Sequence, residues 1–582
     1  MDSTVAARIA RRFITLPLDK RALYLEKMLA EGVSPANLPI PEVQSAFEQL
    51  PLSFAQERQW FLWQLEPHSS AYHIPMALRL RGRLDRQALQ GAFERLVERH
   101  QTLRTRFVFD QTRPLQVIDP VAGLAIAHEV VGPLDLAQLE ARVAEETRQP
   151  FDLEAGPLLR VRLLELAPDD QVLVLTQHHI VSDGVSMQVM VGELIALYAG
   201  LSLGQAPTLA PLPIQYADYA LWQRHWMEAG ERDRQLAYWT ERLGAQQPVL
   251  ELPLDHSRPA QPSYRGARCN LQLPAALSHD LQALARAEGG TLFMLLLAAF
   301  HALLHRYSGQ DDIRIGVPSA NRNRVETEGL IGYFVNTQVI RAQVAGEQPF
   351  VELLRQVRQH ALDAQAYQEL PFEQLVEALA PERTLGLNPL FQVMFNHQAA
   401  GRGGATSARL GDLQIEGVDS VTEVAQLDLT LETRESPEGL EASFIYATDL
   451  FERSTIERLS THFINLLQGI VEQPQQPVAE LPLLAAAERE RTLVTWNATA
   501  ENYPLEQSIQ QLIEAQVQRT PDAPALAFGE TRLSYAQLNA RANRLAHRLI
   551  ALGVGADVLV GIAVERSVEM VVGLLAILKA GG

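Results

Sequence analysis

Apolar residues recur at two different spacings along the chain, which predicts alternating helices and strands. In residues 6–32 they repeat at helical spacing as far as Gly32, so we expect an N-terminal helix followed by a proline-containing linker. From about Leu50, short apolar segments such as Leu158–Leu166 and Gln171–Thr176 have the length and composition of strands and alternate with helical segments. This alternation predicts an α/β fold.

The same pattern begins again near Ala267, which predicts a second α/β lobe. A strand is expected at Cys269–Leu273 and another at Asp312–Val317, with a long helical stretch between them. An aromatic helix, Tyr216–Trp239, and a proline-rich run, Pro248–Pro262, lie between the two blocks. Two lobes joined in this way are expected to leave a cleft.

The chain therefore divides into five predicted segments. A stretch rich in Gln and Pro after Glu472 has the composition of an extended tether, and a new pattern begins near Asn502. The predicted segments are an N-terminal linker or docking-like helical segment (1–47), a first lobe (48–262), a second lobe (263–470), a linker (471–501) and the start of another domain (502–582).

Composition and charge argue against several classes of protein. The 582 residues carry a formal net charge of −19, which makes nucleic acid an unfavourable partner. Cys269 is the only cysteine, so a disulfide framework and a multi-cysteine metal site are excluded, and a cytoplasmic location is expected. The longest apolar run, Thr291–Leu304, is too short to span a membrane, and residues 1–13 lack a signal-peptide core.

The segment from Gln171 to Ser186 carries the main candidate chemistry. An apolar strand leads directly into His178 and His179, and because side chains alternate along a strand, only one of these rings can enter a given cleft. Asp183 follows at the expected start of a helix, where it can cap the helix or pair with a cation. A histidine, an aspartate and a glycine at such a corner suit acyl transfer, in which a base handles the proton of an attacking amine.

Other interpretations of an isolated histidine pair are open at this point. The two residues could be structural histidines at a strand end, or they could bind a metal together with Asp183, although ligands on opposite strand faces converge poorly. The sequence contains no Gly-x-Ser-x-Gly elbow and no Walker-type loop, which argues against serine-hydrolase and P-loop chemistry.

The run His178-His179-Ile-Val-Ser-Asp183-Gly184 resembles the His-His-x-x-x-Asp-Gly signature of the condensation domains of nonribosomal peptide synthetases. Seven ordered motifs over about 420 residues outweigh the structural interpretation of the histidine pair. The six further segments that resemble motifs of this family, in the family's order, are Ser53-Phe-Ala-Gln-Glu-Arg58-Gln-Trp60, Arg99-His100-Gln-Thr-Leu-Arg104-Thr-Arg-Phe107, Tyr216-Ala-Asp-Tyr-Ala-Leu-Trp222, Gly332-Tyr-Phe-Val-Asn-Thr337, Leu370-Pro-Phe-Glu373 and Asn388-Pro-Leu390.

The resemblance implies a fold of two chloramphenicol-acetyltransferase-like lobes in a V-shaped pseudo-dimer, with a tunnel at their junction. His179 then corresponds to the catalytic histidine, and His178 and Gly184 support it. Peptide bonds would form between a donor thioester and an acceptor amine, each delivered on the phosphopantetheine of a peptidyl carrier domain, upstream and downstream respectively. The chain itself is expected to bind no cofactor and no metal.

Two further site residues follow only by analogy with the family. Asp183 is expected to pair with an arginine of the strand Asp312–Val317, and Arg314 is the hypothesis for that partner. Asn388 is expected near the tunnel, with a plain turn before Pro389 as the equal alternative. The departures from the family pattern, Val185, Gln101 and Tyr367, remove no catalytic atom but can alter substrate preference.

The C-terminal segment resembles the opening of an adenylation domain, at Leu533-Ser-Tyr-Ala-Gln-Leu538, Asn539-Ala-Arg-Ala-Asn-Arg544 and Leu578-Lys-Ala-Gly-Gly582. It stops before the phosphate-binding loop of such a domain, so we do not expect it to activate an amino acid. The wording of the chain also resembles synthetases for pyoverdine-type siderophores. The alternative functions are a non-catalytic relative that recruits an enzyme to a carrier protein and a coenzyme A-dependent acyltransferase.

Overall fold

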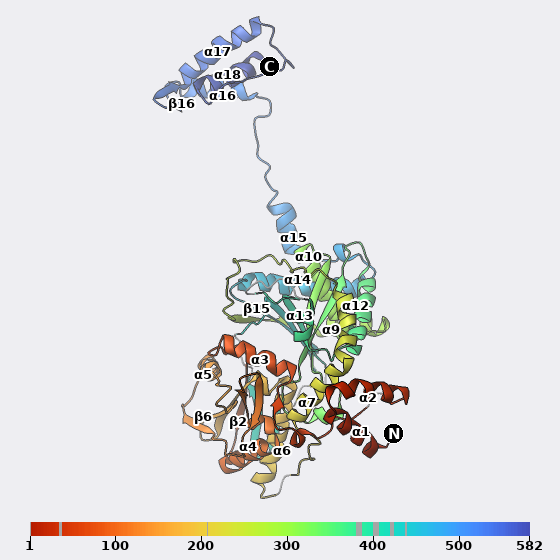
Figure 1. Ribbon diagram of the computed structural model, residues 1–582. Coiled ribbons are helices and arrows are strands. Elements are labelled where there is room, and N and C mark those ends of the chain that lie inside the picture. The colour runs from red at the N-terminus through yellow and green to blue at the C-terminus, as the bar shows by residue number, and fades with distance from the viewer. Residues whose placement is uncertain are drawn as a thin grey trace. The chain divides into compact units, whose positions relative to one another are not determined.

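The computed structural model describes residues 2–33, 38–205, 208–379, 387–399, 407–418, 424–436 and 439–582. The chain divides into two units, Met1–Ala486 and Ala487–Gly582, here called unit 1 and unit 2 (Figure 1). Unit 1 contains two lobes, each built on a six-stranded sheet with helices packed against it. The predicted α/β fold with two lobes is therefore confirmed.

The first lobe is a sheet of order β12-β13-β2-β7-β6-β5 with helices on both faces. Apolar side chains of α4 and α6 cover one face and those of α5 cover the other, so the central strand β7 is buried along almost its whole length. The elements are β2 (His73–Arg81), α4 (Arg86–Arg99), β5 (Ala127–Val130), α5 (Leu136–Arg148), β6 (Leu159–Ala167), β7 (Asp170–His178), α6 (Gly184–Ser202), β12 (Ser407–Leu410) and β13 (Leu413–Val418).

A small three-stranded sheet of order β1-β4-β3 adjoins this lobe. Helix α3 begins at a capping box formed by Ser53 and Gln56 and buries Trp60 against Phe107 of the small sheet. The elements are β1 (Leu50–Pro51), α3 (Phe54–Leu65), β3 (Thr105–Phe109) and β4 (Pro114–Ile118).

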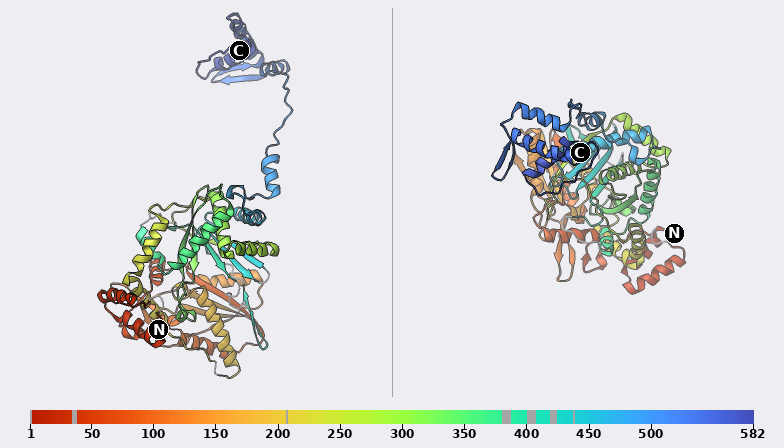
Figure 2. Two further views of the ribbon diagram at one scale, coloured as in Figure 1. Left: turned by 90° about the vertical axis from the view of Figure 1, so that its right-hand side faces the viewer. Right: turned by 90° about the horizontal axis from the view of Figure 1, so that it is seen from above.

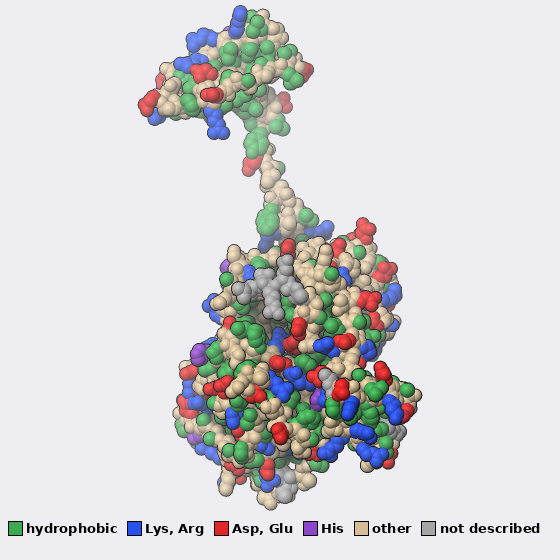
Figure 3. Space-filling model, in the orientation of Figure 1, with side chains coloured by type: hydrophobic (Ala, Val, Ile, Leu, Met, Phe, Trp, Pro, Cys, Tyr) green, Lys and Arg blue, Asp and Glu red, His purple; other side chains and the backbone are tan. Residues whose placement is uncertain are grey.

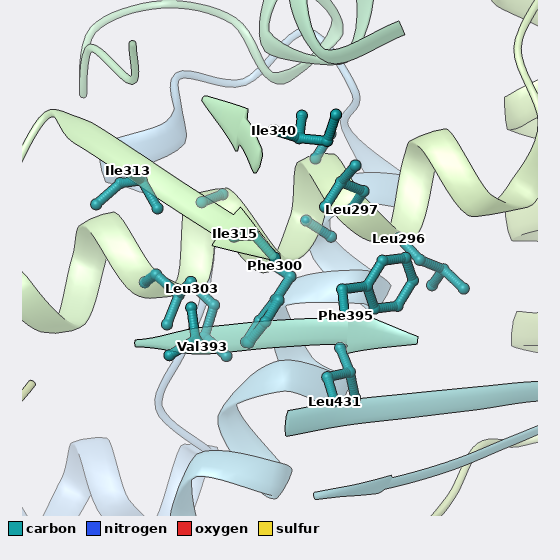
Figure 4. Close-up of a cluster of buried hydrophobic side chains, with 14 of the residues drawn as sticks. Leu296, Leu297, Phe300, Leu303, Ile313, Ile315, Ile340, Val393, Phe395 and Leu431 are labelled. Carbon is teal, nitrogen blue, oxygen red and sulfur yellow. The ribbon is translucent and has the colours of Figure 1, made fainter. Parts of the chain in front are cut away.

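The second lobe is a mixed sheet of order β10-β9-β11-β14-β15-β8 packed against α10, which is apolar on nearly every face and therefore forms the centre of the core. Figure 4 shows Leu297, Phe300 and Leu303 of this helix beside Ile315 and Phe395 of the sheet. The elements are β8 (Gly266–Gln272), α9 (Ala275–Ala287), α10 (Leu292–Ser308), β9 (Asp312–Ser319), α11 (Val325–Glu328), β10 (Asn336–Gln343), α12 (Phe350–Ala366), α13 (Phe372–Leu379), β11 (Val393–Gln398), β14 (Leu429–Ser436), β15 (Gly439–Ala447) and α14 (Arg453–Glu472).

A segment from the second half of the chain completes the sheet of the first lobe. Strand β13 pairs antiparallel with β2, with Gln414 opposite Arg81 and Val418 opposite Ala77. Its Leu413 side chain is buried in the core of the first lobe. The two lobes are therefore joined by shared sheet structure as well as by the chain between them.

Two long helices predicted from periodicity are each broken. The N-terminal pattern forms α1 (Ser3–Thr15) and α2 (Leu18–Ala30), because Pro17 has no backbone N–H and holds Leu16 in an extended conformation. The aromatic pattern forms α7 (Tyr216–Trp226), a π-helical turn at Met227–Glu231 and α8 (Arg232–Leu243), with Gly230 at φ 109° in the turn. In Figures 1 and 2, α1 and α2 lie at the side of unit 1 beside α7.

Unit 2 has a small core formed by Leu533, Leu538, Ala542, Val568, Val572 and Leu575. Residues 471–486 before it belong to unit 1, where Val478 and Leu481 are buried in the second lobe. The helices and strands around and within unit 2 are α15 (Ala486–Glu490), α16 (Ile509–Arg519), β16 (Pro524–Phe528), β17 (Thr531–Ser534), α17 (Tyr535–Ala551) and α18 (Val568–Ala580).

One helix in the described part of the chain, α6, is long and apolar enough to cross a membrane, and the pair α9 and α10 passes the same test only as a span bent by 102°. Helix α6 buries Met187, Met190, Leu194 and other side chains in the core of the first lobe. Acidic and basic side chains are interspersed over the face of unit 1 that Figure 3 presents.

Candidate active site

The histidine pair lies where β7 ends and α6 begins. Strand β7 ends at His178, and His179 opens a single 3-10 turn that leads to Asp183. The Asp183 side chain accepts a hydrogen bond from the Ser186 N–H at 2.7 Å, so it caps α6. The predicted strand-to-helix corner, with Asp183 at the helix entry, is confirmed.

The imidazole of His178 is buried and acts as a structural group. Its Nδ1 accepts a hydrogen bond from the Ile180 N–H at 3.1 Å, which stabilises the turn. The ring packs against His73 and Phe151, with centroid separations of 5.9 Å and 6.3 Å. Burial lowers the pKa of His178 well below its ordinary value, so this ring is neutral at neutral pH.

His179 faces the other way, toward Tyr333 of the second lobe, with 4.8 Å between the ring centroids. Its Nδ1 lies 2.9 Å from the Ser182 carbonyl oxygen, which can only accept, so Nδ1 carries the proton and Nε2 of the neutral ring keeps a lone pair. Burial lowers the pKa of His179, and the nearby Asp183 carboxylate only partly opposes that effect. The ring is therefore held neutral, with Nε2 able to accept a proton or a hydrogen bond.

Asp183 joins the helix entry of the first lobe to the second lobe. Its buried carboxylate accepts hydrogen bonds from Arg322 at 3.2 Å and from the Phe334 N–H at 3.0 Å. The Arg322 side chain is only 6% exposed. It also donates to the carbonyls of Thr327 and Leu330 and lies over the Phe334 ring. This buried ion pair fixes the corner that carries His179 against the loop preceding β10.

The prediction that Arg314 is the partner of Asp183 is wrong. Arg314 lies in β9 and donates to the carbonyl oxygens of Leu243 and Gln246, both at 2.9 Å, and to Asp312 at 3.2 Å. Its guanidinium therefore fixes the end of α8 against β9. The partner is Arg322, which lies three residues beyond the end of that strand.

A cavity of about 1470 Å³ lies between the lobes, and we call it the interlobe cavity. His179 and Gly184 line it from the first lobe, and Tyr333 and Asn388 line it from the second. This arrangement brings the histidine of the signature and the asparagine of the last motif to one space. It can accommodate two substrates that approach the Nε2 atom of His179.

Gly184 and Asn388 contribute shape to this cavity in different ways. Among the described residues, no atom lies within 4 Å of a Cβ built on Gly184, so a side chain there would extend into open space at the wall. The Asn388 side chain accepts a hydrogen bond from the Leu390 N–H at 3.3 Å, while its carbonyl accepts from Gln392 at 3.0 Å. Asn388 thus both shapes the turn around Pro389 and lines the cavity.

Three of the sequence motifs meet behind His179 through contacts that periodicity does not reveal. Tyr216 donates to the backbone carbonyl of Tyr333 at 2.5 Å, and Ser53 lies 2.9 Å from the Tyr216 hydroxyl. A Cβ on Gly332 would lie 2.0 Å from the Tyr216 ring, so the glycine allows this close approach. The motif resemblance marked these residues as important, but long-range contacts of this kind leave no local pattern.

An ion pair between the lobes also went unrecognised. Arg58 of α3 lies 3.4 Å from Glu373 of α13 and 5.5 Å from the centre of the Phe372 ring. Burial raises the pKa of Glu373, an effect that Arg58 opposes. Arg58 also lines the interlobe cavity, so this pair holds α13 next to the wall that faces His179.

Within the described residues, no group of three or more His, Cys, Asp or Glu side chains is placed to hold a metal ion. His178 and His179 face different surroundings, and Asp183 is occupied by Arg322. The metal-site interpretation of the histidine pair therefore lacks a geometric basis at this corner.

Comparison with protein-family models gives two matches. The model described as "Condensation domain" matches residues 47–493, and the model described as "AMP-binding enzyme" matches residues 513–582. The first match covers both lobes and the histidine corner. The second lies within unit 2, where the sequence resembled the opening of an adenylation domain.

Relatives with similar sequences are parts of large synthetases. A linear gramicidin synthase of Brevibacillus parabrevis is 45% identical over 569 residues, which are 96% of this chain and 7% of that protein. Malpinin synthetase of Mortierella alpina is 43% identical over 584 residues, which are 100% of this chain and 8% of that protein. The chain therefore spans less than a tenth of the length of these two relatives.

Solved structures give the same fold. The X-domain from teicoplanin biosynthesis is 31% identical, with a TM-score of 0.69, over 75% of this chain and 98% of that one. A four-domain nonribosomal peptide synthetase bound to AMP and glycine has a TM-score of 0.82 at 24% identity, over 92% of this chain and 41% of that one.

Proposed function

Because the chain belongs to the condensation-domain family, we propose that unit 1 forms peptide bonds between two carrier-bound substrates. The α-amine of an acceptor aminoacyl thioester would attack the carbonyl carbon of a donor aminoacyl or peptidyl thioester. A C–N bond forms, the C–S bond of the donor breaks, and the donor carrier's phosphopantetheine leaves as a thiol. The acceptor carrier then holds a chain longer by one amide bond.

The observation that carries this proposal is the neutral His179 ring at the wall of a cavity lined by both lobes. A free α-amine has an ordinary pKa of about 7.7 to 8.0 and is mostly protonated at neutral pH, so it must lose a proton to react. The Nε2 lone pair of His179 can take that proton and return it to the departing thiolate. The competing role is positioning, in which Nε2 only accepts a hydrogen bond from the amine.

The partners in this proposal are an upstream donor carrier domain and a downstream acceptor carrier domain, both of which bring their own phosphopantetheine. An adenylation domain in the same chain, of which unit 2 resembles the opening, would load the acceptor carrier. For the lobes we propose the boundaries 48–262 and 263–470, preceded by the linker or docking-like segment 1–47. A cytoplasmic location stays a prediction.

The product also stays a prediction. The resemblance to pyoverdine-type siderophore synthetases rests on the wording of the sequence, and neither relative named above is a siderophore synthetase by name. Acceptor carriers loaded with different amino acids, offered in competition, would test this assignment.

The test of the function is a reconstituted condensation. The full chain is mixed with an upstream carrier loaded with an aminoacyl group and a downstream carrier loaded with its amino acid, and dipeptidyl carrier is measured by mass spectrometry. Wild type should form the dipeptide and a folded His179→Ala variant should not. A His179→Asn variant separates the two roles, because it keeps a hydrogen-bonding side chain but cannot take the proton. Substantial activity of that variant would support positioning over proton transfer.

A second candidate is a non-catalytic domain that recruits another enzyme to a carrier. It is favoured by the similarity to the X-domain from teicoplanin biosynthesis, which was also solved in complex with OxyB. The intact His-His-x-x-x-Asp-Gly segment argues against it. Firm carrier binding without dipeptide from any substrate pair, in the same assay, would favour recruitment.

A further inference from the structure

A second cavity of about 490 Å³ lies in the first lobe and shares no lining residue with the interlobe cavity. It is enclosed by the start of β3, the loop before β5, the strands β5 to β7 and the end of α5. This volume falls within the range of about 300 to 1000 Å³ that is typical of pockets for small molecules. Neither family motif nor catalytic geometry accounts for it.

The interior of this second cavity is apolar. Its walls include Val97 and Leu103 on one side, Leu159 and Val161 of β6 on another, and Leu124 of the covering loop. All five belong to the core cluster of the first lobe or pack against it, so these walls are rigid. A ligand must therefore offer an apolar body to fill the space.

The rim is basic, and two of its four arginines are already neutralised. Arg106 lies 3.1 Å from the carboxylate of Asp119. Arg162 lies 2.9 Å from the carboxylate of Glu146. These two pairs use the acidic side chains that line the cavity, which leaves the other two arginines without a matching charge.

Arg104 and Arg160 form no carboxylate ion pair within the described ranges of the chain. Arg104 donates to the backbone carbonyl of Asp119, and Arg160 donates to the backbone carbonyl of Pro150 at 2.9 Å while it lies 3.8 Å above the Phe151 ring. The Nε atom of each is buried and has no hydrogen-bond partner among the described residues. Such donors are costly to bury, because a charged N–H in a low-dielectric site seeks an anion.

We propose that the second cavity binds an amphipathic anion, with its carboxylate or phosphate head held by Arg104 and Arg160 and its apolar body against Leu103, Leu124 and Leu159. Guanidinium groups bind both kinds of head group through paired, charge-assisted hydrogen bonds. Occupancy supplies the anion that the two arginines lack. The site is separate from the peptide-forming cavity, and the proposal does not depend on the function of that cavity.

Titration calorimetry on the full chain tests this proposal with octanoate, octyl phosphate and octanol. Both anions share the apolar body of octanol, and comparison of the two identifies the preferred head group. The variants Arg104→Gln and Ala127→Trp should each weaken the binding of the better anion at least about tenfold, the first by removing a charge and the second by filling the cavity from the edge strand β5. Arg113→Gln, on an exposed side chain of the same lobe, and Gly184→Trp, in the interlobe cavity, should leave the affinity unchanged.

Three results would overturn the proposal. Wild type binding neither anion would show that the cavity takes no such ligand, and octanol binding as tightly as the anions would show that the arginines do not recognise a head group. Loss of binding in Gly184→Trp but not in Ala127→Trp would place the ligand in the interlobe cavity instead. Thermal unfolding of each variant checks that weaker binding does not reflect a misfolded first lobe.

Discussion

Replacing Asp183 by asparagine tests the ion pair that ties the two lobes together at the histidine corner. The amide keeps an oxygen for the Ser186 N–H, so the cap of α6 survives, but the buried Arg322 loses its anion. Removing one partner of a buried pair costs about 3 to 5 kcal/mol. Because Arg322 keeps its carbonyl contacts and the Phe334 ring, we expect the lower end, about 3 kcal/mol of unfolding free energy.

Urea unfolding followed by tryptophan fluorescence measures this cost. Trp496 is the only one of the six tryptophans in unit 2, so the signal reports mainly on unit 1. Double-mutant cycles then identify the partner of Asp183. Combination with Arg322→Met should give a coupling above about 1 kcal/mol, whereas combination with Arg314→Met should be additive within about 0.5 kcal/mol. A cost of Asp183→Asn below about 1 kcal/mol, or equal coupling to both arginines, would refute the reasoning.

Two further predictions concern the histidine cluster and the cavity wall. Burial lowers the pKa of His73 to about 4, so the unfolded chain gains a proton below about pH 6.5 that the folded chain does not, and stability falls as the pH drops from 6.5 toward 4. His73→Phe should reduce that loss by up to about 1.4 kcal/mol per pH unit in urea titrations, whereas the exposed His68→Phe should leave it unchanged; a wild-type slope in the first variant would contradict this. Gly184→Trp should obstruct the interlobe cavity and lower the rate of dipeptide formation at least about tenfold, whereas Gly192→Trp, on the same helix with equally open surroundings, should retain the rate; equal rates would exclude Gly184 from the substrate path.

Much of the histidine corner could be predicted because its signals are local. An apolar strand ends at His178, and Asp183 stands just before a helical pattern, so the turn and the cap follow from spacing alone. The break at Pro17 was also readable, since proline disfavours a continuous helix, but the apolar repeat on both sides of it obscured the break.

The contacts that complete the site could not be predicted in the same way. Arg314 and Arg322 lie in one stretch of chain, and only the path of the backbone after β9 decides which guanidinium reaches Asp183. The pairing of β13 with β2 joins residues more than 300 positions apart, and nothing in the periodicity of either strand specifies the other. Such choices depend on tertiary packing, which a single sequence does not display.

The exchange of β13 between the lobes has a consequence for anyone who divides or recombines this protein. A cut between residues 262 and 263 would leave the first fragment without the strand that covers the edge of β2, and an open edge in a largely apolar sheet is a site of aggregation. The second fragment would carry Leu413 and Ile415 with no core to bury them. The two lobes are therefore one heritable part, to be moved whole or left in place.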